Sequence, residues 1–205
     1  LFRSYYAPQG WTSDDTDAAE RVKIQYGTSM CYPVSSMGSH VSVVPNHQLN
    51  RKTPLHTRAN VAYFGTFGYE LDLNKLSDEE ISEVKQQITF MKEYRELIQF
   101  GTFYRLKSPF EGNETVWMTV SEDKKTALVF WYRERNVVNA DFTRVRLQGL
   151  DPDLIYRNEY NETENYGDEL MNLGLLTTDC TAGEPTSEDE PCTDYESRIY
   201  VLTAK

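Results

Sequence analysis

Residues 77–109 read SDEEISEVKQQITFMKEYRELIQFGTFYRLKSP, and within this stretch the chain changes from a helical to a β pattern. Ser77 to Glu80 form a capping box, in which the first and last side chains each bond a free backbone N–H at a helix start. Apolar side chains then recur at spacings of three and four, at Ile81, Val84, Ile88, Met91, Tyr94 and Ile98. This spacing predicts a surface helix that packs one stripe against a larger structure.

After Ser108-Pro109, short runs rich in β-branched and aromatic residues alternate with polar turns. The runs expected as strands are residues 115–120, 126–132, 143–147 and 198–202. Strands at this spacing, joined by turns, are typical of a small antiparallel sandwich. The sequence therefore predicts helical, barrel-like material up to about residue 107 and an antiparallel β domain after it.

Upstream of the long helix, residues 11–17 read WTSDDTD and form an acidic turn. Three aspartates, Asp14, Asp15 and Asp17, lie where a helix N-terminus favours negative charge, so a helix is expected to follow and to end near Gly27. The apolar run NVAYFG at residues 60–65 is expected as a buried barrel strand.

The charge balance excludes some partners. The 205 residues include 32 acidic and 21 basic side chains, which gives a net charge of -11. Such a chain is repelled by phosphate backbones and by anionic membrane surfaces, so neither nucleic acid nor a membrane is an expected partner. No apolar run approaches the roughly 20 residues that span a bilayer.

The cysteines and sequons leave the localisation open between the cytoplasm and secretion. Cys31 lies in an apolar stretch and is expected to be buried. Cys180 and Cys192 flank a loop rich in Pro, Gly, Ser and acidic residues, which a disulfide could close. That disulfide and the two Asn-x-Thr sequons, at Asn113 and Asn161, would agree with secretion.

The acidic turn is the strongest chemical feature of the chain. Glycoside hydrolysis needs one protonated carboxyl near the leaving oxygen and one carboxylate facing the anomeric carbon, and clustered carboxylates are one way to keep a proton on a member of the pair. The plainer interpretation is a helix cap with acidic residues in its first turn. A calcium loop fits less well, because the Gly and distal Glu of an EF-hand are missing.

The turn and its surroundings resemble the general acid/base segment of bacterial and fungal family 36 α-galactosidases. The similar segments are residues 11–18 (WTSDDTDA), 20–21, 23–29, 32–33, 36–42, 45–47, 53–55, 64–73 (FGTFGYELDL), 95–101, 108–114 (SPFEGNE), 149–152 and 167–171. They follow one another over most of residues 5–175, which is more specific than a single motif.

The resemblance implies the C-terminal segments of a (β/α)8 barrel over residues 1–107 and an antiparallel β-sandwich domain over residues 108–205. It also implies a double displacement that releases terminal α-linked galactose from oligosaccharides such as melibiose or raffinose with retained configuration. No metal or organic cofactor is needed for that chemistry, and family members often form homo-oligomers. The choice of galactoside and the choice between hydrolysis and transfer stay open.

Site residues follow from the resemblance position by position. Asp14 is expected to be the general acid/base, and Asp15 a helper that contacts substrate. Trp11 is expected to shape the mouth of the substrate pocket or to form a buried wall. Asp17 is expected to cap the helix or to support the other carboxyls.

Other parts of the family's site have no counterpart in this sequence. The nucleophile is expected in a Lys-Trp-Asp segment, and neither this segment nor the Cys- and Gly-rich loop of the family occurs here. The chain alone is therefore expected to be inactive unless the rest of the barrel or a companion chain supplies them.

Two alternatives belong to other classes. One is a non-catalytic fragment for carbohydrate binding or subunit assembly, since 14 Tyr, 9 Phe and 3 Trp offer many aromatic faces for sugar rings. The other is a metal site at His40, His47 and His56, but these lack nearby Cys or carboxylate ligands, and supporting positions in loops are expected instead.

Overall fold

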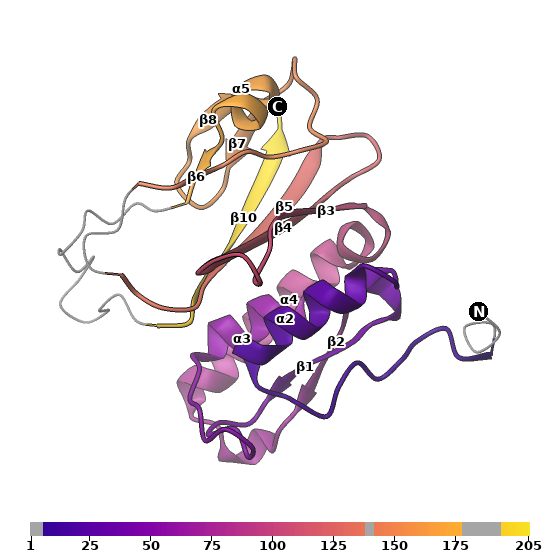
Figure 1. The fold of residues 1–205 in the computed structure, drawn as a ribbon, viewed down its shortest axis with the longest axis vertical. Helices are drawn as coiled ribbons and strands as arrows, with labels where there is room; N and C mark the ends of the chain where they lie inside the picture. The colour runs from indigo at the N-terminus through magenta and orange to yellow at the C-terminus, as the bar shows by residue number, and fades with distance from the viewer. Residues whose placement is uncertain (1–5, 138–141, 178–193) are drawn as a thin grey trace. The chain divides into compact units, whose positions relative to one another are not determined.

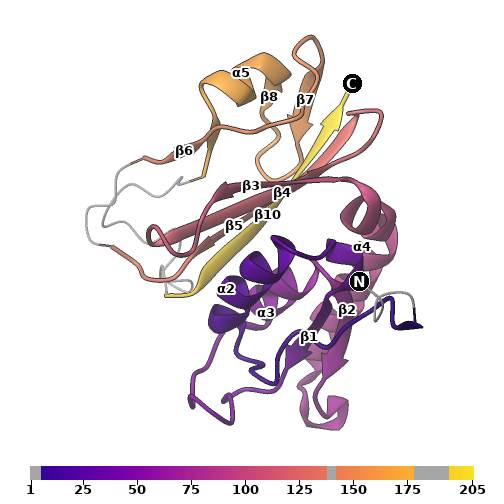
Figure 2. The same cartoon turned by 45° about the vertical axis from the view of Figure 1, so that its right-hand side comes forward.

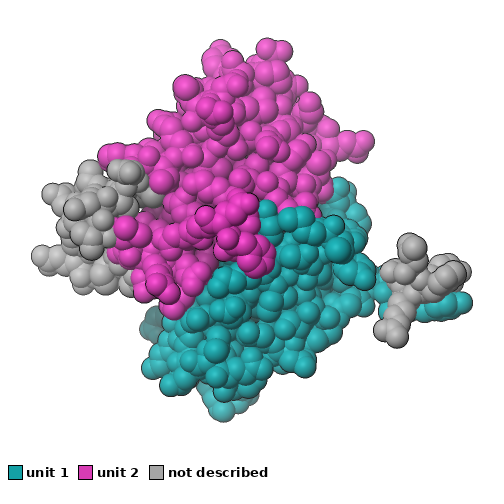
Figure 3. Space-filling view, viewed as in Figure 1, with its two compact units in different colours: residues 1–100 teal, residues 101–205 magenta. Residues whose placement is uncertain are grey.

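The computed structural model describes residues 6–137, 142–177 and 194–205. The chain divides into two compact units, Leu1–Phe100 and Gly101–Lys205, which Figure 3 shows in separate colours. The first unit combines helices with two parallel strands, and the second is built from antiparallel strands (Figure 1).

The first unit has a strand-helix-strand core. Strands β1 (Gly38–Ser42) and β2 (Thr66–Glu70) are parallel neighbours, and helix α3 (Leu55–Ala62) connects them. Helix α2 (Ala18–Ser29) lies beside α3, as Figure 2 shows, and two short 3-10 helices, η1 (Val34–Ser36) and η2 (Leu73–Lys75), complete the connections. Gly10 forms a parallel bridge with Met37, so the chain before α2 extends alongside the start of β1.

The expectation of a buried strand over residues 60–65 is wrong. Asn60 to Ala62 form the end of α3, and the strand begins at Thr66. A short apolar run fits a buried helix as well as a buried strand, and here Pro54 starts the helix by fixing a backbone angle suited to its N-terminus. The side-chain amide of Gln25 then donates to the carbonyls of Val61 and Phe64, at 2.9 and 3.2 Å, where α3 ends.

The long helix is confirmed as α4 (Asp78–Phe100). Ser77 N–H donates to Glu80 Oε2 at 2.9 Å and Glu80 N–H to Ser77 Oγ at 3.2 Å, which is the predicted capping box. Val84, Met91 and Ile98 of the predicted stripe are buried.

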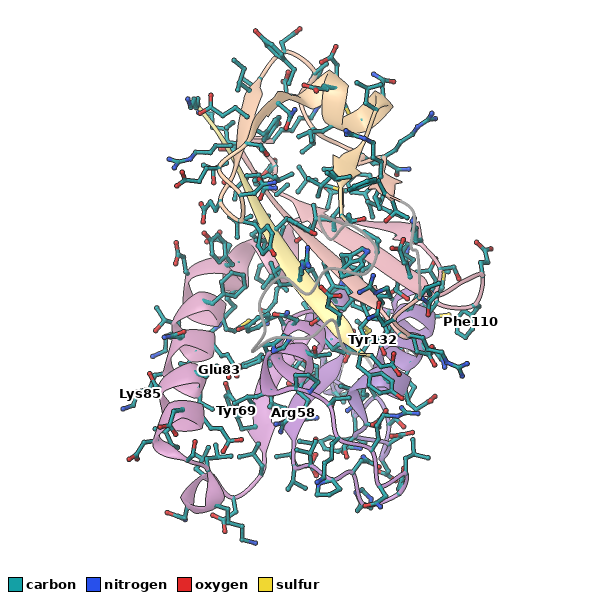
Figure 4. The ribbon with its side chains drawn as sticks, turned by 90° about the vertical axis from the view of Figure 1, so that its left-hand side faces the viewer. Arg58, Tyr69, Glu83, Lys85, Phe110 and Tyr132 are labelled. Atoms are coloured by element: carbon teal, nitrogen blue, oxygen red, sulfur yellow. The ribbon has the colours of Figure 1, made fainter. Side chains whose placement is uncertain are left out.

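A polar chain joins α4 to β2. Tyr69 Oη donates to Gln87 Oε1 at 2.8 Å, and Gln87 Nε2 donates to Glu83 Oε1 at 2.7 Å. Figure 4 shows Glu83 on the side of α4 that faces Tyr69 and Arg58, whereas Lys85 points away. Burial and the nearby Glu83 carboxylate raise the pKa of Tyr69, so its hydroxyl keeps the proton that it donates.

The second unit contains a six-stranded antiparallel sheet. Its order is β3-β4-β5-β10-β7-β8. The strands are β3 (Thr102–Lys107), β4 (Glu114–Val120), β5 (Thr126–Arg133), β7 (Ile155–Asn158), β8 (Glu164–Tyr166) and β10 (Glu196–Ala204). A two-stranded sheet of β6 (Arg144–Val145) and β9 (Leu175–Leu176) accompanies it, together with helix α5 (Gly167–Asn172).

One face of the large sheet forms an apolar core. Alternate residues of β4 and β5 pair across the strands, Val116 with Trp131 and Met118 with Val129, and all four are at most 1% exposed. Side chains from β6, β9 and α5 pack against them, including Val145, Leu170 and Leu175. These antiparallel sheets with a core between them are consistent with the predicted sandwich.

The four predicted strands all occur, but one is shorter than expected, because only Arg144–Val145 of residues 143–147 pairs with another strand. The pattern missed β3, β7 and β8, whose residues are mostly half-buried or exposed. Strand β3 pairs with β4, and the division between the units falls at Phe100, ahead of residue 107.

Cys31 is exposed, so the expectation that it is a buried core residue is wrong. It lies in the turn after α2, between Met30 and Tyr32, which are also exposed. Cys180 and Cys192 lie outside the described residues. No helix within the described ranges is long and apolar enough to cross a membrane.

Candidate functional site

The acidic turn is fixed to the parallel strands at its start and to α2 at its end. Gly10 N–H donates to Ser36 O and Gly38 N–H to Gly10 O, both at 2.9 Å. Thr12 Oγ1 then donates to Gly38 O at 2.7 Å. Residues 13–17 therefore form a loop between a strand-like segment and helix α2. Thr12, directly before this loop, anchors it to β1.

Asp17 is the helix cap. Its Oδ2 accepts from Glu20 N–H at 3.1 Å, and the same oxygen pairs with the guanidinium of Arg51. Its side chain is 1% exposed. This confirms the expected capping role, because a buried, doubly bonded carboxylate at this position stabilises the helix start and is closed to substrate.

Asp15 holds the loop together from inside. Its backbone N–H donates to Ser13 Oγ at 3.0 Å, and its Oδ1 accepts from Asp17 N–H at 2.9 Å. The residue is half-buried, and its negative charge acts on the guanidinium of Arg21. One of its carboxylate oxygens is thus occupied by the loop backbone.

Asp14 is exposed, unlike the other two aspartates. Its Oδ1 accepts a hydrogen bond from Trp11 Nε1 at 2.9 Å. The Trp11 side chain is 56% exposed, which excludes a buried wall within this chain, and its ring lies 4.4 Å from the ring of His40. The turn therefore presents one carboxyl beside an exposed indole.

Arg21, which the sequence analysis did not select, and His40, which it considered only as a metal ligand, lie close to each other next to this turn. Arg21 of α2 is 2% exposed, and its Nη2 lies 3.4 Å from His40 Nδ1. His40 lies within strand β1 and not in a loop, which corrects the expectation for this histidine. The spacing of Asp17 and Arg21, four residues apart, was the available signal that Arg21 lies one helical turn from the loop.

Burial lowers the pKa of both Arg21 and His40. Burial lowers the pKa of Arg21, while the carboxylates of Asp15 and Glu70 oppose the shift. Burial and the adjacent Arg21 lower the pKa of His40, and Glu70 opposes this shift too. His40 is therefore neutral at neutral pH, and the pair carries one positive charge.

The three histidines do not come together as a metal site. Across the described parts of the chain, no three His, Cys, Asp or Glu side chains are grouped so that they could hold a metal ion. His47 and His56 are exposed, and His40 contacts Trp11 and Arg21 instead.

Comparisons with known proteins place the chain in the class of glycoside hydrolases. The melibiase profile matches residues 3–101, and the profile of the glycosyl hydrolase family 36 C-terminal domain matches residues 114–202. The chain belongs to glycoside hydrolase family 36 and corresponds to the C-terminal portion of its α-galactosidases.

The similar curated proteins come from bacteria and fungi. The chain is 55% identical to α-galactosidase AgaA of Geobacillus stearothermophilus over 83% of its own length and 23% of that protein. It is 44% identical to the probable α-galactosidase G of Aspergillus terreus over the same shares of the two chains. The chain thus spans about a quarter of the length of these relatives.

Solved structures agree with the family. The crystal structure of the family 36 α-galactosidase AgaB of Geobacillus stearothermophilus matches with a TM-score of 0.90 and 48% identity, over 99% of this chain and 26% of that one. Two variants of AgaA, in complex with raffinose and with stachyose, both match with a TM-score of 0.89, over 99% and 98% of this chain and 27% and 26% of theirs. Their sequences are 48% and 49% identical to this chain.

Proposed function

We propose that this chain is the C-terminal part of a retaining α-galactosidase, hereafter the complete enzyme, and that Asp14 is its general acid/base. The observation that carries the proposal is the different placement of the three aspartates. Asp17 is buried in the helix cap and Asp15 bonds the loop backbone, whereas Asp14 is exposed beside Trp11.

The proposed barrel is supported by the first unit. Parallel β1 and β2 with α3 between them are one strand-helix-strand unit of such a fold, and Gly10 extends the pattern by one strand position. Catalytic groups of (β/α)8 barrels lie on loops that lead from strands into helices, which is where the acidic turn lies. Residues 1–100 would then form the last barrel segments, and residues 101–205, which include β3, the β-sandwich domain.

In the proposed mechanism, Asp14 first donates its proton to the leaving oxygen of the glycosidic bond. As a carboxylate, it then removes a proton from the water that hydrolyses the glycosyl-enzyme. The N–H of Trp11 holds one carboxylate oxygen, Oδ1, so the orientation of the group is fixed before substrate binds. Asp15 and the exposed Trp11 ring would contact the sugar.

A carboxylate nucleophile completes the pair and comes from the remainder of the barrel or from a companion chain. This chain by itself is therefore inactive under the proposal. We further expect the complete enzyme to be a homo-oligomer that uses no metal or organic cofactor. Its substrates would be oligosaccharides with terminal α-linked galactose, as in the raffinose and stachyose complexes of similar proteins.

The decisive experiment replaces Asp14 by Asn in the complete enzyme and measures kcat/KM on raffinose. A general acid contributes about 10²–10⁴-fold, so the variant should lose activity on that scale. Asp15→Asn should keep most of the activity, and Asp153→Asn, at an exposed turn in the second unit, should keep all of it.

Undiminished galactose release by the Asp14→Asn enzyme would exclude Asp14 as the acid/base. If Asp14→Asn instead kept its kcat and only lost affinity for galactosides, the alternative of a non-catalytic carbohydrate-binding fragment would be favoured.

A further inference from the structure

The buried guanidinium of Arg21 has no partner for most of its donors. Nε and Nη1 are fully buried and make no hydrogen bond with any side chain or backbone group of the described chain. Nη2 lies 3.4 Å from His40 Nδ1. Burying a charge with unused donors destabilises a fold, so Arg21 is a candidate for a role in the site that it faces.

The His40 ring packs against two glycines of the parallel strands. A Cβ atom at Gly38, on the same strand, would lie 3.6 Å from His40 Cε1, and one at Gly68, its partner on β2, would lie 3.7 Å from His40 Cδ2. Both distances are ordinary van der Waals contacts, so the ring lies directly against the two glycines. It lies on the face of the sheet opposite Ser39, whose hydroxyl donates to the Ala62 carbonyl of α3.

The protonation of His40 decides whether its Nδ1 donates or accepts a hydrogen bond. The groups that act on it are Arg21 from α2 and Glu70 from the end of β2, with the Trp11 ring of the acidic turn against its face. Neutral His40 accepts from Arg21 Nη2 through Nδ1 and so carries its proton on Nε2. Because a guanidinium can only donate, this contact favours the tautomer with the proton on Nε2.

The contacts continue to the candidate acid/base. The His40 ring packs on the Trp11 ring with centroids 4.4 Å apart and planes inclined by 34°. Trp11 Nε1 donates to Asp14 Oδ1 at 2.9 Å. Arg21, His40, Trp11 and Asp14 thus form a continuous series from a buried cation to an exposed carboxyl.

We propose that Arg21 and His40 are positioning residues that hold the Trp11 indole, and through it the Asp14 carboxyl, in the orientation for proton transfer. This inference rests on the proposed function of Asp14. Neither residue touches the reacting atoms in this proposal; each acts through Trp11. Misplacing a catalytic group by about 1 Å costs up to about 10²-fold in rate, so the series is expected to control proton transfer more than binding.

The test compares two substrates in the complete enzyme. Raffinose leaves as a sugar alkoxide that needs a proton, whereas p-nitrophenyl α-galactoside leaves as a stable phenolate that needs little assistance. His40→Ala should lower kcat/KM on raffinose by about tenfold or more and on the nitrophenyl substrate by less than about threefold. His47→Ala, at an exposed position of the same unit, should change neither value.

Three further variants separate the links of the series. His40→Phe keeps a ring against Trp11 and loses the acceptor for Arg21, so it should retain more raffinose activity than His40→Ala. Arg21→Met should resemble His40→Phe. In an Asp14→Asn background, His40→Ala should cause no further loss, because both changes remove the same proton transfer.

Two results would overturn the inference. One is an equal loss on both substrates, which indicates a general structural role; the other is an effect of His40→Ala that adds in full to that of Asp14→Asn. If His40→Ala is not recovered folded, His40→Phe and Trp11→Phe carry the same substrate comparison. The proposed function fails separately, through full activity of Asp14→Asn alone.

Discussion

Both units of the chain bury apolar side chains, and the first also buries charged and amide side chains that bond to the ends of its helices and strands. In the first unit, Asp17, Arg21, Gln25 and Arg58 are all buried, and three of them bond to the ends of helices or strands. In the second unit, one face of the sheet buries a continuous set of apolar side chains, with Trp131 and Leu202 among them. The unit with the candidate site thus adds directional polar bonds at the ends of its elements to an apolar core of its own.

This difference has a physical consequence for the acidic turn. Directional bonds from buried side chains fix the ends of secondary structures, and those ends are where the candidate groups lie. Arg58 Nη1 donates to Ser42 O at the end of β1, and Asp17 holds the start of α2 directly after the turn. A purely apolar core would pack the elements without specifying the positions of their ends.

The largest expected effect on the free energy of unfolding comes from a cavity in the apolar core of the second unit. Trp131→Ala removes a side chain that is 1% exposed and lies beneath the guanidinium groups of Arg133 and Arg198. The resulting cavity should lower the free energy of unfolding of this unit by about 3–5 kcal/mol. Denaturant unfolding, followed by hydrogen exchange of peptides from each unit, measures the loss and locates it.

The matched control is Trp11→Ala in the first unit. This indole is largely exposed, so its removal should change stability by less than about 0.5 kcal/mol. A large loss of stability at Trp11, or a small one at Trp131, would contradict the contrast between the two units.

The next effect breaks a polar bond of the first unit. Gln25→Leu keeps a side chain of similar size and removes the donor to the carbonyls of Val61 and Phe64. The unsatisfied carbonyls should cost about 1–3 kcal/mol. Gln86→Leu, on the exposed side of α4, is the control and should be close to neutral. Equal stabilities of the two variants would show that this amide does not hold the end of α3.

The sequence predicted the regular parts of both units and missed what depends on tertiary contacts. The capping box, the α4 stripe and strands β4, β5 and β10 follow from the spacing of residues along the chain, which is visible in the sequence itself. The local pattern of residues 60–65 predicts a strand because it does not include the effect of Gln25. The Gln25 side chain bonds the end of a helix there, at Val61, from 36 positions away in the sequence.

The candidate site divides in the same way. The position of its three aspartates before a helix predicts both the acidic turn and the capping role of Asp17. Which carboxyl is exposed depends on tertiary contacts such as that of Asp17 with Arg51, 34 residues away, and the sequence pattern does not specify them. Arg21 and His40 come together across 19 positions from a helix and a strand, so only the fold brings them to the turn.

A smaller effect is expected at the exposed start of α4. Ser77→Ala removes the oxygen that accepts from Glu80 N–H and so breaks half of the capping box. The loss should be about 1 kcal/mol, since N-cap substitutions cost this much where water can partly replace the bond. Ser82→Ala, at an exposed position within the helix, is the control for the lost hydroxyl. A cost for Ser77→Ala as large as that of Gln25→Leu would show that burial adds nothing to a polar bond in this unit.

The smallest effect is a dependence on pH that belongs to the first unit alone, because all three histidines lie there. The folded state lowers the pKa of His40, so between the unfolded value, about 6.5, and the lowered folded value the unfolded chain binds more protons. The contribution of His40 is therefore complete above the unfolded value and is lost as the pH falls through the folded one. Thermal unfolding from pH 8 to pH 5 should show a decline that is flatter in His40→Gln and unchanged in His47→Gln. Equal slopes in His40→Gln and in the unmodified protein would mean that the fold does not lower the pKa of the imidazole beside Arg21.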